Sequence, residues 1–462
     1  MADKHEMMST GSLSKALAWL AAPAILGLIA QTLYGIVDSI FVGRGLGEDG
    51  VLGLAALAVA FPVSYLLICV GSGVGVGGSS FISRGFGAAD KERVQKGIGN
   101  MILMTLAAGV FCTIFGLLLL NPLLILFGAT EANMPFAQDY MFWIILGCIF
   151  QIMTITLNSV VMAQGNAVYS MTMYFISSLI NVVLDYIFIF EFGWGIQGAA
   201  IATVLCQILN VAILVFYLYR VSNLHFSLRW IRFDRPAFSE IGKVGFSEFL
   251  REGSLVFTLI IIVWNLKFYG DDTHIAIYGL INRIFGFVFI PAIGIVQGMI
   301  PLAGFNYGAK NYERVRKIVK MSLAWSIIIL FVLTALTYIF TTQIFTLFMP
   351  DDPALVKEAV IAYWIADIMI PIIAIQVIGS AFMQALGKAR ASFILAVARQ
   401  FIMIPIMLVF PYLFGLVGIW IAFPVADILA SVLTLWFVVS QFKSLKTEEK
   451  LQEKYKRENM AV

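Results

Sequence analysis

Charged residues are scarce in this chain. Lys, Arg, Asp and Glu make up 12% of its 462 residues, whereas an ordinary soluble domain carries about 25%. Hydrophobic residues make up 61%, and single soluble cores stop growing beyond roughly 250–300 residues. The composition therefore excludes a soluble enzyme, a nucleic-acid-binding module and a disordered chain. It indicates a protein that crosses the membrane many times.

Cysteine and histidine are also rare. The four cysteines stand alone in apolar runs, and the three histidines form no cluster. The chain therefore offers neither a disulfide framework nor a zinc motif. We find no catalytic constellation, and we predict a protein that is not an enzyme and needs no cofactor.

Long apolar runs are abundant. A helix needs about 20 apolar residues to cross the hydrocarbon core, and twelve runs of suitable length are present. The first six cover residues 15–42, 51–82, 97–119, 139–162, 170–190 and 197–219. The second six cover residues 244–268, 274–302, 321–349, 358–385, 392–414 and 416–440. We predict an all-α polytopic membrane protein with twelve transmembrane helices.

Basic residues gather in alternate connections between these helices. They are concentrated at 84–96, 220–243, 310–320 and 388–390, and the other connections contain few of them. Cytoplasmic loops of membrane proteins carry an excess of Lys and Arg. Both termini are therefore predicted to be cytoplasmic.

The two halves of the chain resemble each other. GAADKERVQK (87–96) matches GAKNYERVRK (308–317), AQGNA (163–167) matches ALGKA (385–389), and GIQGAAIATVLCQIL (195–209) matches GLVGIWIAFPVADIL (415–429). We expect an N-terminal six-helix lobe (1–219), a basic cytoplasmic linker (220–243), a C-terminal six-helix lobe (244–442) and a charged cytoplasmic tail (443–462). Parallel repeats of this kind are typical of transporters, although a duplicated bundle could also serve another role.

Two carboxylates in the first half lie well inside predicted spans. Asp38 precedes Arg44 by six residues, and Asp185 precedes Glu191 by six. At 1.5 Å per residue, both lie about 9 Å below the outer helix ends, at the depth of Thr203. Asn181 and Ala199 lie one turn from Asp185 and Thr203 on the same faces.

This group of side chains is a candidate ion site. Carboxylates inside a membrane are costly and by default functional. Two carboxylates, an amide and a hydroxyl would suit either a shared proton or a dehydrated Na⁺. In the alternative, Asp185 hydrogen-bonds within the bundle, Asp38 only reaches the interface, and Thr203 bonds to its own backbone.

The first span carries a polar face. Gln31, Tyr34 and Asp38 follow i, i+3, i+7 spacing, which places them on one side of a helix. Pro23 lies on the same helix and either bends it during function or makes a static kink.

The second half does not repeat the carboxylate site. Its buried charges either pair with one another, Arg399 with an acid for example, or line a second part of a cavity. These residues are Glu248, Glu252, Asp367, Arg399 and Asp427.

The sequence resembles a known family in several segments, which occur in the same order along the chain. Pro23, Gln31, Tyr34, Asp38 and Pro62, with the two GA(x)₃ERV loops and the AQGNA and ALGKA helix ends, resemble the multidrug and toxic compound extrusion (MATE) family. The DinF-like and MepA-like bacterial branches are the most similar. The resemblance implies a monomeric antiporter of the bacterial cytoplasmic membrane, which exports cationic or amphipathic organic compounds in exchange for H⁺ or Na⁺.

The resemblance also implies roles for single residues. Ion coupling would carry over to Asp38, Asn181, Asp185 and Thr203, and substrate contact to Gln31, Tyr34 and Asn158. The chain departs from the NorM-like branch on its tenth span, where Ile375 and Gln376 stand in place of an acid. That departure puts coupling through a C-terminal carboxylate in doubt.

A flippase of lipid-linked precursors is the alternative function. It would favour a strongly cationic cavity for a pyrophosphate, whereas the first half has no Lys or Arg embedded in its spans.

Overall fold

The computed structural model describes residues 2–222, 227–349 and 353–460, and these residues form helices without any β-strand. Ten helices are long and apolar enough to cross a membrane, and two bent helix pairs raise the number of spans to 12 when each pair counts as one. The predicted fold class is confirmed.

The first half of the chain contains six spans. They are α2 (Leu13–Gly45), α3 (Gly50–Gly87), α4 (Lys91–Leu118), the pair α6 (Met134–Leu146) and α7 (Cys148–Ala163), α8 (Ala167–Tyr186) and α9 (Gly195–Phe216). The other helices of this half are α1 (Ala2–Ser9) and α5 (Leu120–Leu126). Wider π-helical turns end α8 and α9 at Ile187–Glu191 and Tyr217–Val221, and a 3₁₀ turn, Gly47–Asp49, follows α2.

The second half contains the matching six spans. They are α10 (Arg235–Tyr269), α11 (Asp272–Gly308), α12 (Tyr312–Ile339), the pair α14 (Pro353–Ala366) and α15 (Ile370–Ala385), α16 (Ala389–Phe414) and α17 (Leu416–Met460). The short helix α13 (Thr341–Phe348) occupies the place of α5, and a 3₁₀ turn, Leu228–Trp230, precedes α10.

Helix ends differ from the sequence prediction near the basic connections. α10 begins at Arg235, so the second part of the predicted linker is helical. Asp234 caps this helix, since its carboxylate accepts a hydrogen bond from the Ala237 amide at 3.0 Å; a cap of this kind satisfies an otherwise unpaired amide. Residues 223–226 of that linker and residues 461–462 of the tail lie outside the described chain.

The fourth span of each half is broken, whereas the sequence predicted continuous helices over 139–162 and 358–385. α6 and α7 meet at 51° and α14 and α15 at 42°. Gly147 lies at the first break, where an added Cβ would come within 2.5 Å of the Val204 side chain. Pro371 opens α15, and its ring cannot donate a helical hydrogen bond.

The second helices of the two halves cross in the same way. A Cβ on Gly87 of α3 would lie 1.8 Å from the Phe305 carbonyl oxygen, and a Cβ on Gly308 of α11 would lie 2.1 Å from the Arg84 carbonyl oxygen. Each helix then turns through a residue with positive φ, 56° at Ala89 and 58° at Lys310. The predicted repeat is therefore visible in the backbone, and the lobes touch here without intervening side chains.

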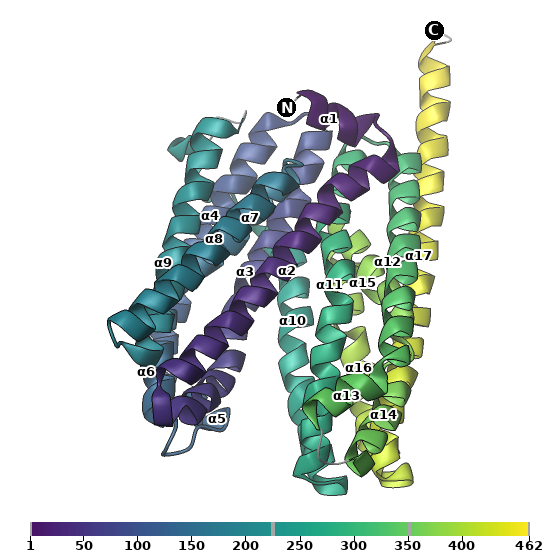
Figure 1. Ribbon diagram of the computed structural model, residues 1–462. Helices are drawn as coiled ribbons and strands as arrows, with labels where there is room; N and C mark the ends of the chain where they lie inside the picture. The colour runs from purple at the N-terminus through teal and green to yellow at the C-terminus, as the bar shows by residue number, and fades with distance from the viewer. Residues whose placement is uncertain (1, 223–226, 350–352, 461–462) are drawn as a thin grey trace.

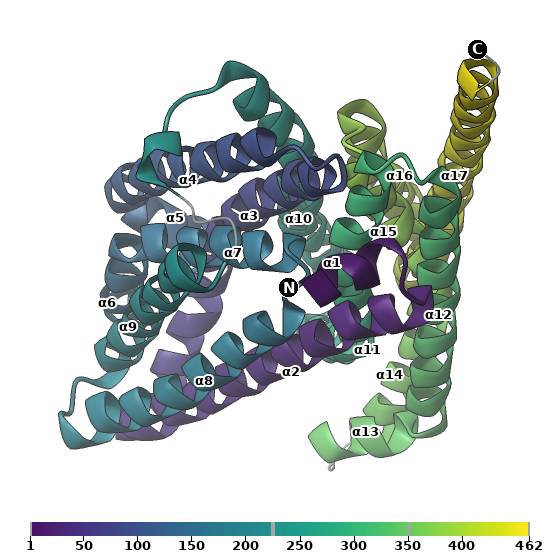
Figure 2. The ribbon, with the colours of Figure 1, turned by 90° about the horizontal axis from the view of Figure 1, so that it is seen from above.

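The two lobes diverge from this crossing. α2 packs against α11 and α10 against α3, so the first helix of each half contacts the second helix of the other. Figure 1 shows the lobes meeting at the end that carries α1 and the tip of α17, and separating toward α5 and α13. We call these the closed end and the open end; Figure 2 looks onto the closed end, with α1 between the lobes.

Candidate functional site

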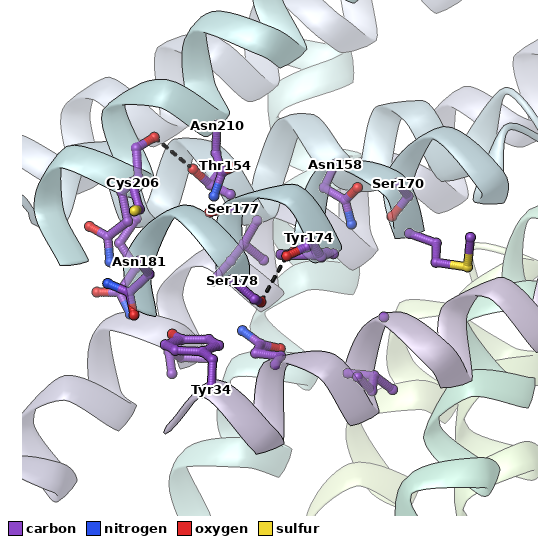
Figure 3. Close-up of a pocket in the computed structure, with 18 of the residues that line it drawn as sticks. Tyr34, Thr154, Asn158, Ser170, Tyr174, Ser177, Ser178, Asn181, Cys206 and Asn210 are labelled. Atoms are coloured by element: carbon purple, nitrogen blue, oxygen red, sulfur yellow. Dashed lines mark hydrogen bonds between the residues drawn. The ribbon is translucent and has the colours of Figure 1, made fainter. Parts of the chain in front are cut away.

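A cavity of about 270 Å³ lies inside the N-terminal lobe. The candidate substrate residues Gln31, Tyr34 and Asn158 all line it, as do Asn181 and Thr203 from the candidate ion set. They come from α2, α7, α8 and α9, and Figure 3 shows the labelled polar side chains of these helices gathered around one space. The structure thus brings together side chains that are far apart in the sequence.

Neutral polar groups dominate the lining of this cavity. The lining residues include seven Asn and Gln amides but no Lys, Arg, Asp or Glu, considering the described residues only. Several of the amide oxygens are buried without a hydrogen-bond partner: Gln151 Oε1, Asn158 Oδ1, Asn181 Oδ1, Gln207 Oε1 and Asn210 Oδ1. Buried polar atoms are rarely left unsatisfied in proteins. The cavity is therefore suited to a guest that supplies hydrogen bonds.

The two predicted carboxylates are buried beside the cavity. Asp38 is 9% exposed and Asp185 is 0% exposed. Asp38 Oδ1 and both carboxylate oxygens of Asp185 have no hydrogen-bond partner in the described structure. The two side chains are near enough to interact electrostatically with each other and with Tyr34. A carboxylate pair that is buried without partners carries a large desolvation cost.

The remaining candidates of the ion set are placed differently. Thr203 lines the cavity, whereas Asp185 and Ala199 are not among its lining residues. Ala199 is fully buried in an apolar cluster with Val42, Ile189 and Ala200, so its methyl group packs in the lobe and does not line the cavity. Asp185 lies two residues before the π-helical turn Ile187–Glu191, a distortion that is frequent at functional sites.

Pro23 also lines the cavity in the N-terminal lobe. α2 runs without a break from Leu13 to Gly45 and includes Pro23. The proline lacks an amide hydrogen, so one carbonyl of the preceding turn has no helical partner.

A second and larger cavity lies between the lobes. Its volume is about 1650 Å³, and its walls come from α2, α3, α6, α7 and α9 on one side and from α11 to α13 on the other. We call it the interlobe cleft. Asp38, Tyr34 and Thr203 line it from the N-terminal lobe, and Tyr34 and Thr203 border both cavities. The carboxylate of Asp38 therefore lies next to the route by which a solute would enter.

Sequence analysis missed several polar residues that belong to this site. Tyr140 lines the cleft and interacts electrostatically with Asp38 and Asp185. Gln151 and Thr154 share a helix face with the predicted Asn158, and Gln207 lies one turn from Thr203. The i, i+3, i+7 spacing that pointed to Gln31, Tyr34 and Asp38 would have found them on the fourth and sixth spans.

The buried charges of the C-terminal lobe are mostly paired. Arg399 Nε donates to Asp427 Oδ1 at 2.6 Å, which confirms the expected pairing of Arg399 with an acid. Arg251 binds Glu248 and Glu252, each at 2.5 Å. The Tyr65 hydroxyl also donates to Glu252. Gln376 donates to the Asp427 carbonyl oxygen at 2.9 Å.

Asp367 differs from the other acids of this lobe. It is 7% exposed, and its Oδ2 atom has no hydrogen-bond partner among the described residues. No group of three His, Cys, Asp or Glu side chains in the described chain is arranged to hold a metal ion. The candidate ion site is of a different kind, because it would use amide and hydroxyl oxygens as well as carboxylates.

Two repeated helical bundles, a polar cavity inside one and a cleft between them define a membrane transporter. A family model described as MatE matches residues 23–187 and again residues 253–409. The chain belongs to the MatE family, and the resemblance inferred from the sequence is confirmed. The prediction of a transporter and not an enzyme is confirmed with it.

Named relatives and solved structures agree with this family. The chain is 26% identical over 428 residues to the multidrug export protein MepA of Staphylococcus saprophyticus, covering 92% of this chain and 94% of that protein. It is 25% identical over 425 residues to MepA of Staphylococcus aureus strain MRSA252, covering 92% and 93%.

The fold matches that of MATE transporters closely. The crystal structure of MATE in the bent conformation has a TM-score of 0.89 and 25% identity, covering 96% of this chain and 98% of that one. An outward-facing multidrug resistance MATE transporter of the MOP superfamily gives the same four values.

Proposed function

We propose that this chain exports cationic and amphipathic organic compounds in exchange for H⁺ or Na⁺, and that Asp38 and Asp185 couple the two movements. The coupling set is completed by Asn181 and Thr203. The protein would act as a monomer in a bacterial cytoplasmic membrane, with both termini in the cytoplasm. The relatives named as multidrug export proteins support the export of drugs.

One observation carries the coupling proposal. Asp38 and Asp185 lie buried, close together and without hydrogen-bond partners for three of their four oxygens. A proton or a dehydrated sodium ion would relieve this unfavourable arrangement, because each supplies the missing electrostatic partner. Asn181, whose Oδ1 atom is also without a partner, lies one helical turn away and could contribute that oxygen to Na⁺.

The position of Asp38 supports competition between ion and substrate. Asp38 lines the interlobe cleft, so a cationic solute in the cleft can approach the same carboxylate that the ion neutralises. Ion binding would then weaken the binding of the solute in the outward-open state. A ligand shifts a conformational equilibrium only through its different affinities for the two states.

The direction of the cleft fits an outward-open state. With the closed end on the cytoplasmic side, the cleft opens to the outside, where the solute leaves and the ion enters. Each net charge that moves inward gains roughly 2.3 kcal/mol per 100 mV of membrane potential. The ion gradient would therefore drive the solute out of the cell.

The flippase alternative receives less support from the cavities. The N-terminal cavity has no Lys or Arg among its described lining residues, and the cleft is lined by the acid Asp38 as well as by Arg44 and Arg283. A pyrophosphate would favour several cations without an acid in their midst.

Transport by reconstituted vesicles tests the proposal. Purified protein would be inserted into vesicles, and export of the dye rhodamine 123 would be followed under an imposed pH gradient and, separately, under an imposed Na⁺ gradient. We expect one of the gradients to drive export by the wild type, and we expect Asp38→Asn and Asp185→Asn to abolish the driven component.

Asp139→Asn is the matched control, because Asp139 is an exposed carboxylate on the same helix as Tyr140. It should export the dye as the wild type does. Unchanged gradient-driven export by both Asp38→Asn and Asp185→Asn would overturn the coupling proposal.

A further inference from the structure

Three arginines lie well inside spans of this chain: Arg251, Arg283 and Arg399. Arg251 pairs with Glu248 and Glu252, and Arg399 pairs with Asp427. Arg283 on α11 has neither an ion pair nor a hydrogen bond to any described residue. Its side chain is exposed and lines the interlobe cleft.

An unpaired charge at this depth needs an explanation. Charged side chains inside membrane spans are costly and are usually found where they face a partner or a transport pathway. Packing of α11 does not require a cation here, because the other residues of this helix that line the cleft are Leu280, Ile284, Gly286, Phe287, Val288 and Ile290. Arg283 is therefore an isolated cation on an apolar wall.

The opposite wall of the cleft carries the complementary charge. Asp38 on α2 lines the same space, with Tyr34, Tyr65 and Tyr140 from the N-terminal lobe. Arg44, an exposed residue near the end of α2, lines the cleft on this side as well. A molecule at the level of Asp38 thus meets a carboxylate and aromatic rings on one wall and the Arg283 guanidinium on the other wall. The cleft volume of about 1650 Å³ is large enough for a drug-sized compound, whose pockets are usually about 300–1,000 Å³.

The guanidinium group has a definite preference for acids. It is planar, always charged and presents paired N–H donors that match the two oxygens of a carboxylate. An amide or a hydroxyl of a substrate would not use this geometry fully.

We propose that Arg283 binds the carboxylate of those substrates that carry both an acidic and a cationic group. The inference rests on the proposed export function and adds to it the residue that recognises the acidic part of such a substrate. Arg283 is then a specificity-determining residue, and Asp38 faces the cationic part of the same molecule.

A matched pair of dyes tests this assignment. Rhodamine 110 carries a free carboxylate, and rhodamine 123 is its methyl ester with the same cationic ring system. Binding of each dye to purified protein would be measured by fluorescence polarisation without any ion gradient. The quantity of interest is the ratio of the two affinities, acid to ester.

We expect Arg283→Gln to lower this ratio about tenfold, the effect of losing a charge-assisted hydrogen bond of roughly 1.4 kcal/mol. Arg283→Lys keeps the charge but loses the fork geometry, and it should give an intermediate ratio. Arg390→Gln removes an exposed arginine of α16 that lines neither cavity, and its ratio should equal that of the wild type.

Each contrary outcome is distinct. If Arg283→Gln lowers the affinity for both dyes equally, Arg283 affects only the closure of the cleft or its overall electrostatic potential. The inference is then wrong. A fall of the same size in Arg390→Gln would also overturn it. If the wild type binds neither dye, the export function proposed for this chain fails together with the inference.

Discussion

At the level of single residues, the site is defined by polar atoms without partners. Asp38 Oδ1, both carboxylate oxygens of Asp185 and Asn181 Oδ1 are buried without hydrogen bonds in the described structure, in or beside a cavity lined by neutral amides and hydroxyls. An unsatisfied buried group costs about 1–3 kcal/mol. A transporter can hold such groups only if its ligands satisfy them during the cycle.

Asn181 should act on the ion more than on the solute. We expect Asn181→Leu, which keeps the size of the side chain and removes its polar atoms, to raise the half-saturating concentration of the coupling ion about tenfold. The measurement is the dependence of dye export on Na⁺ concentration or pH. Asn210→Leu, in the same cavity two turns beyond Thr203, should change dye affinity and leave the ion requirement as it is.

Sequence reasoning found part of this site and missed part for a physical reason. Depth along the helix axis can be counted from the helix ends, so Asp38, Asp185 and Thr203 were predicted at one level. The direction in which a side chain points depends on how the helix is rotated about its axis. Helix packing sets that rotation, and counting residues does not reveal it, so Ala199 was predicted in the site but lies in an apolar cluster. Arg283 was not among the charges predicted for the second half, because its place on the wall of the cleft follows from the separation of the two lobes.

At the level of helices, the closed end depends on glycine. Gly87 and Gly308 let α3 and α11 cross in backbone contact, and the Glu240 carboxylate adds ion pairs to Arg84 at 2.5 Å and Arg93 at 3.0 Å. Both glycines belong to the GA(x)₃ERV loops that the sequence had matched. The sequence repeat predicted that the two glycines occupy equivalent positions, but the contact between their helices could be seen only in the structure.

Overpacking this crossing should open the closed end. In Gly87→Ala the new methyl group would collide with the Phe305 carbonyl oxygen, at a cost of about 1–3 kcal/mol to the closed contact. Spin labels would be attached at Lys91→Cys and Lys388→Cys, one on each lobe near this end. The distance between the two labels, measured by electron paramagnetic resonance, should be longer in Gly87→Ala than in its parent.

Gly279→Ala provides the control on α11, because a Cβ there meets nothing within 4 Å. It should leave the distance distribution as in the parent protein. Identical distributions in Gly87→Ala and its parent would show that the crossing does not limit opening.

The helix breaks could not be predicted from apolar length. Residues 139–162 and 358–385 read as continuous spans, yet each is bent by more than 40°. Hydropathy measures length and composition, whereas the break at Gly147 lies where α9 packs so closely that a Cβ would collide with Val204. Helix starts such as Arg235 and Tyr312 were also placed too late, because they lie in charged segments capped by Asp234 and Asn311.

At the level of the whole molecule, a symmetric scaffold carries asymmetric chemistry. The twelve spans and their repeat follow from composition and from matched segments of the sequence. Among the described residues, the unpartnered carboxylate pair lies in the first half, whereas three of the four acids predicted to be buried in the second half, Glu248, Glu252 and Asp427, are paired with Arg251 or Arg399. Duplication supplies two lobes that can move against each other, while the ion chemistry is concentrated in one of them.

The orientation of this scaffold makes a direct prediction. If both termini are cytoplasmic, a cysteine at Glu131, in the exposed α5–α6 connection of the open end, should react with a membrane-impermeant thiol reagent in intact cells. A cysteine at Leu451, which is 62% exposed on the projecting end of α17, should react only after the cells are permeabilised. The reverse pattern would place the cleft on the cytoplasmic side.

The central claim is that the coupling ion and the exported compound compete through Asp38 and Asp185. Binding affinities linked in this way change each other by the same factor. The most direct measurement is the affinity of purified protein for rhodamine 123 as a function of pH and of Na⁺ concentration, in the wild type and in Asp185→Asn. The account predicts that dye affinity falls as the coupling ion is raised in the wild type and that it no longer depends on that ion in Asp185→Asn. An equal ion dependence in both proteins would contradict it.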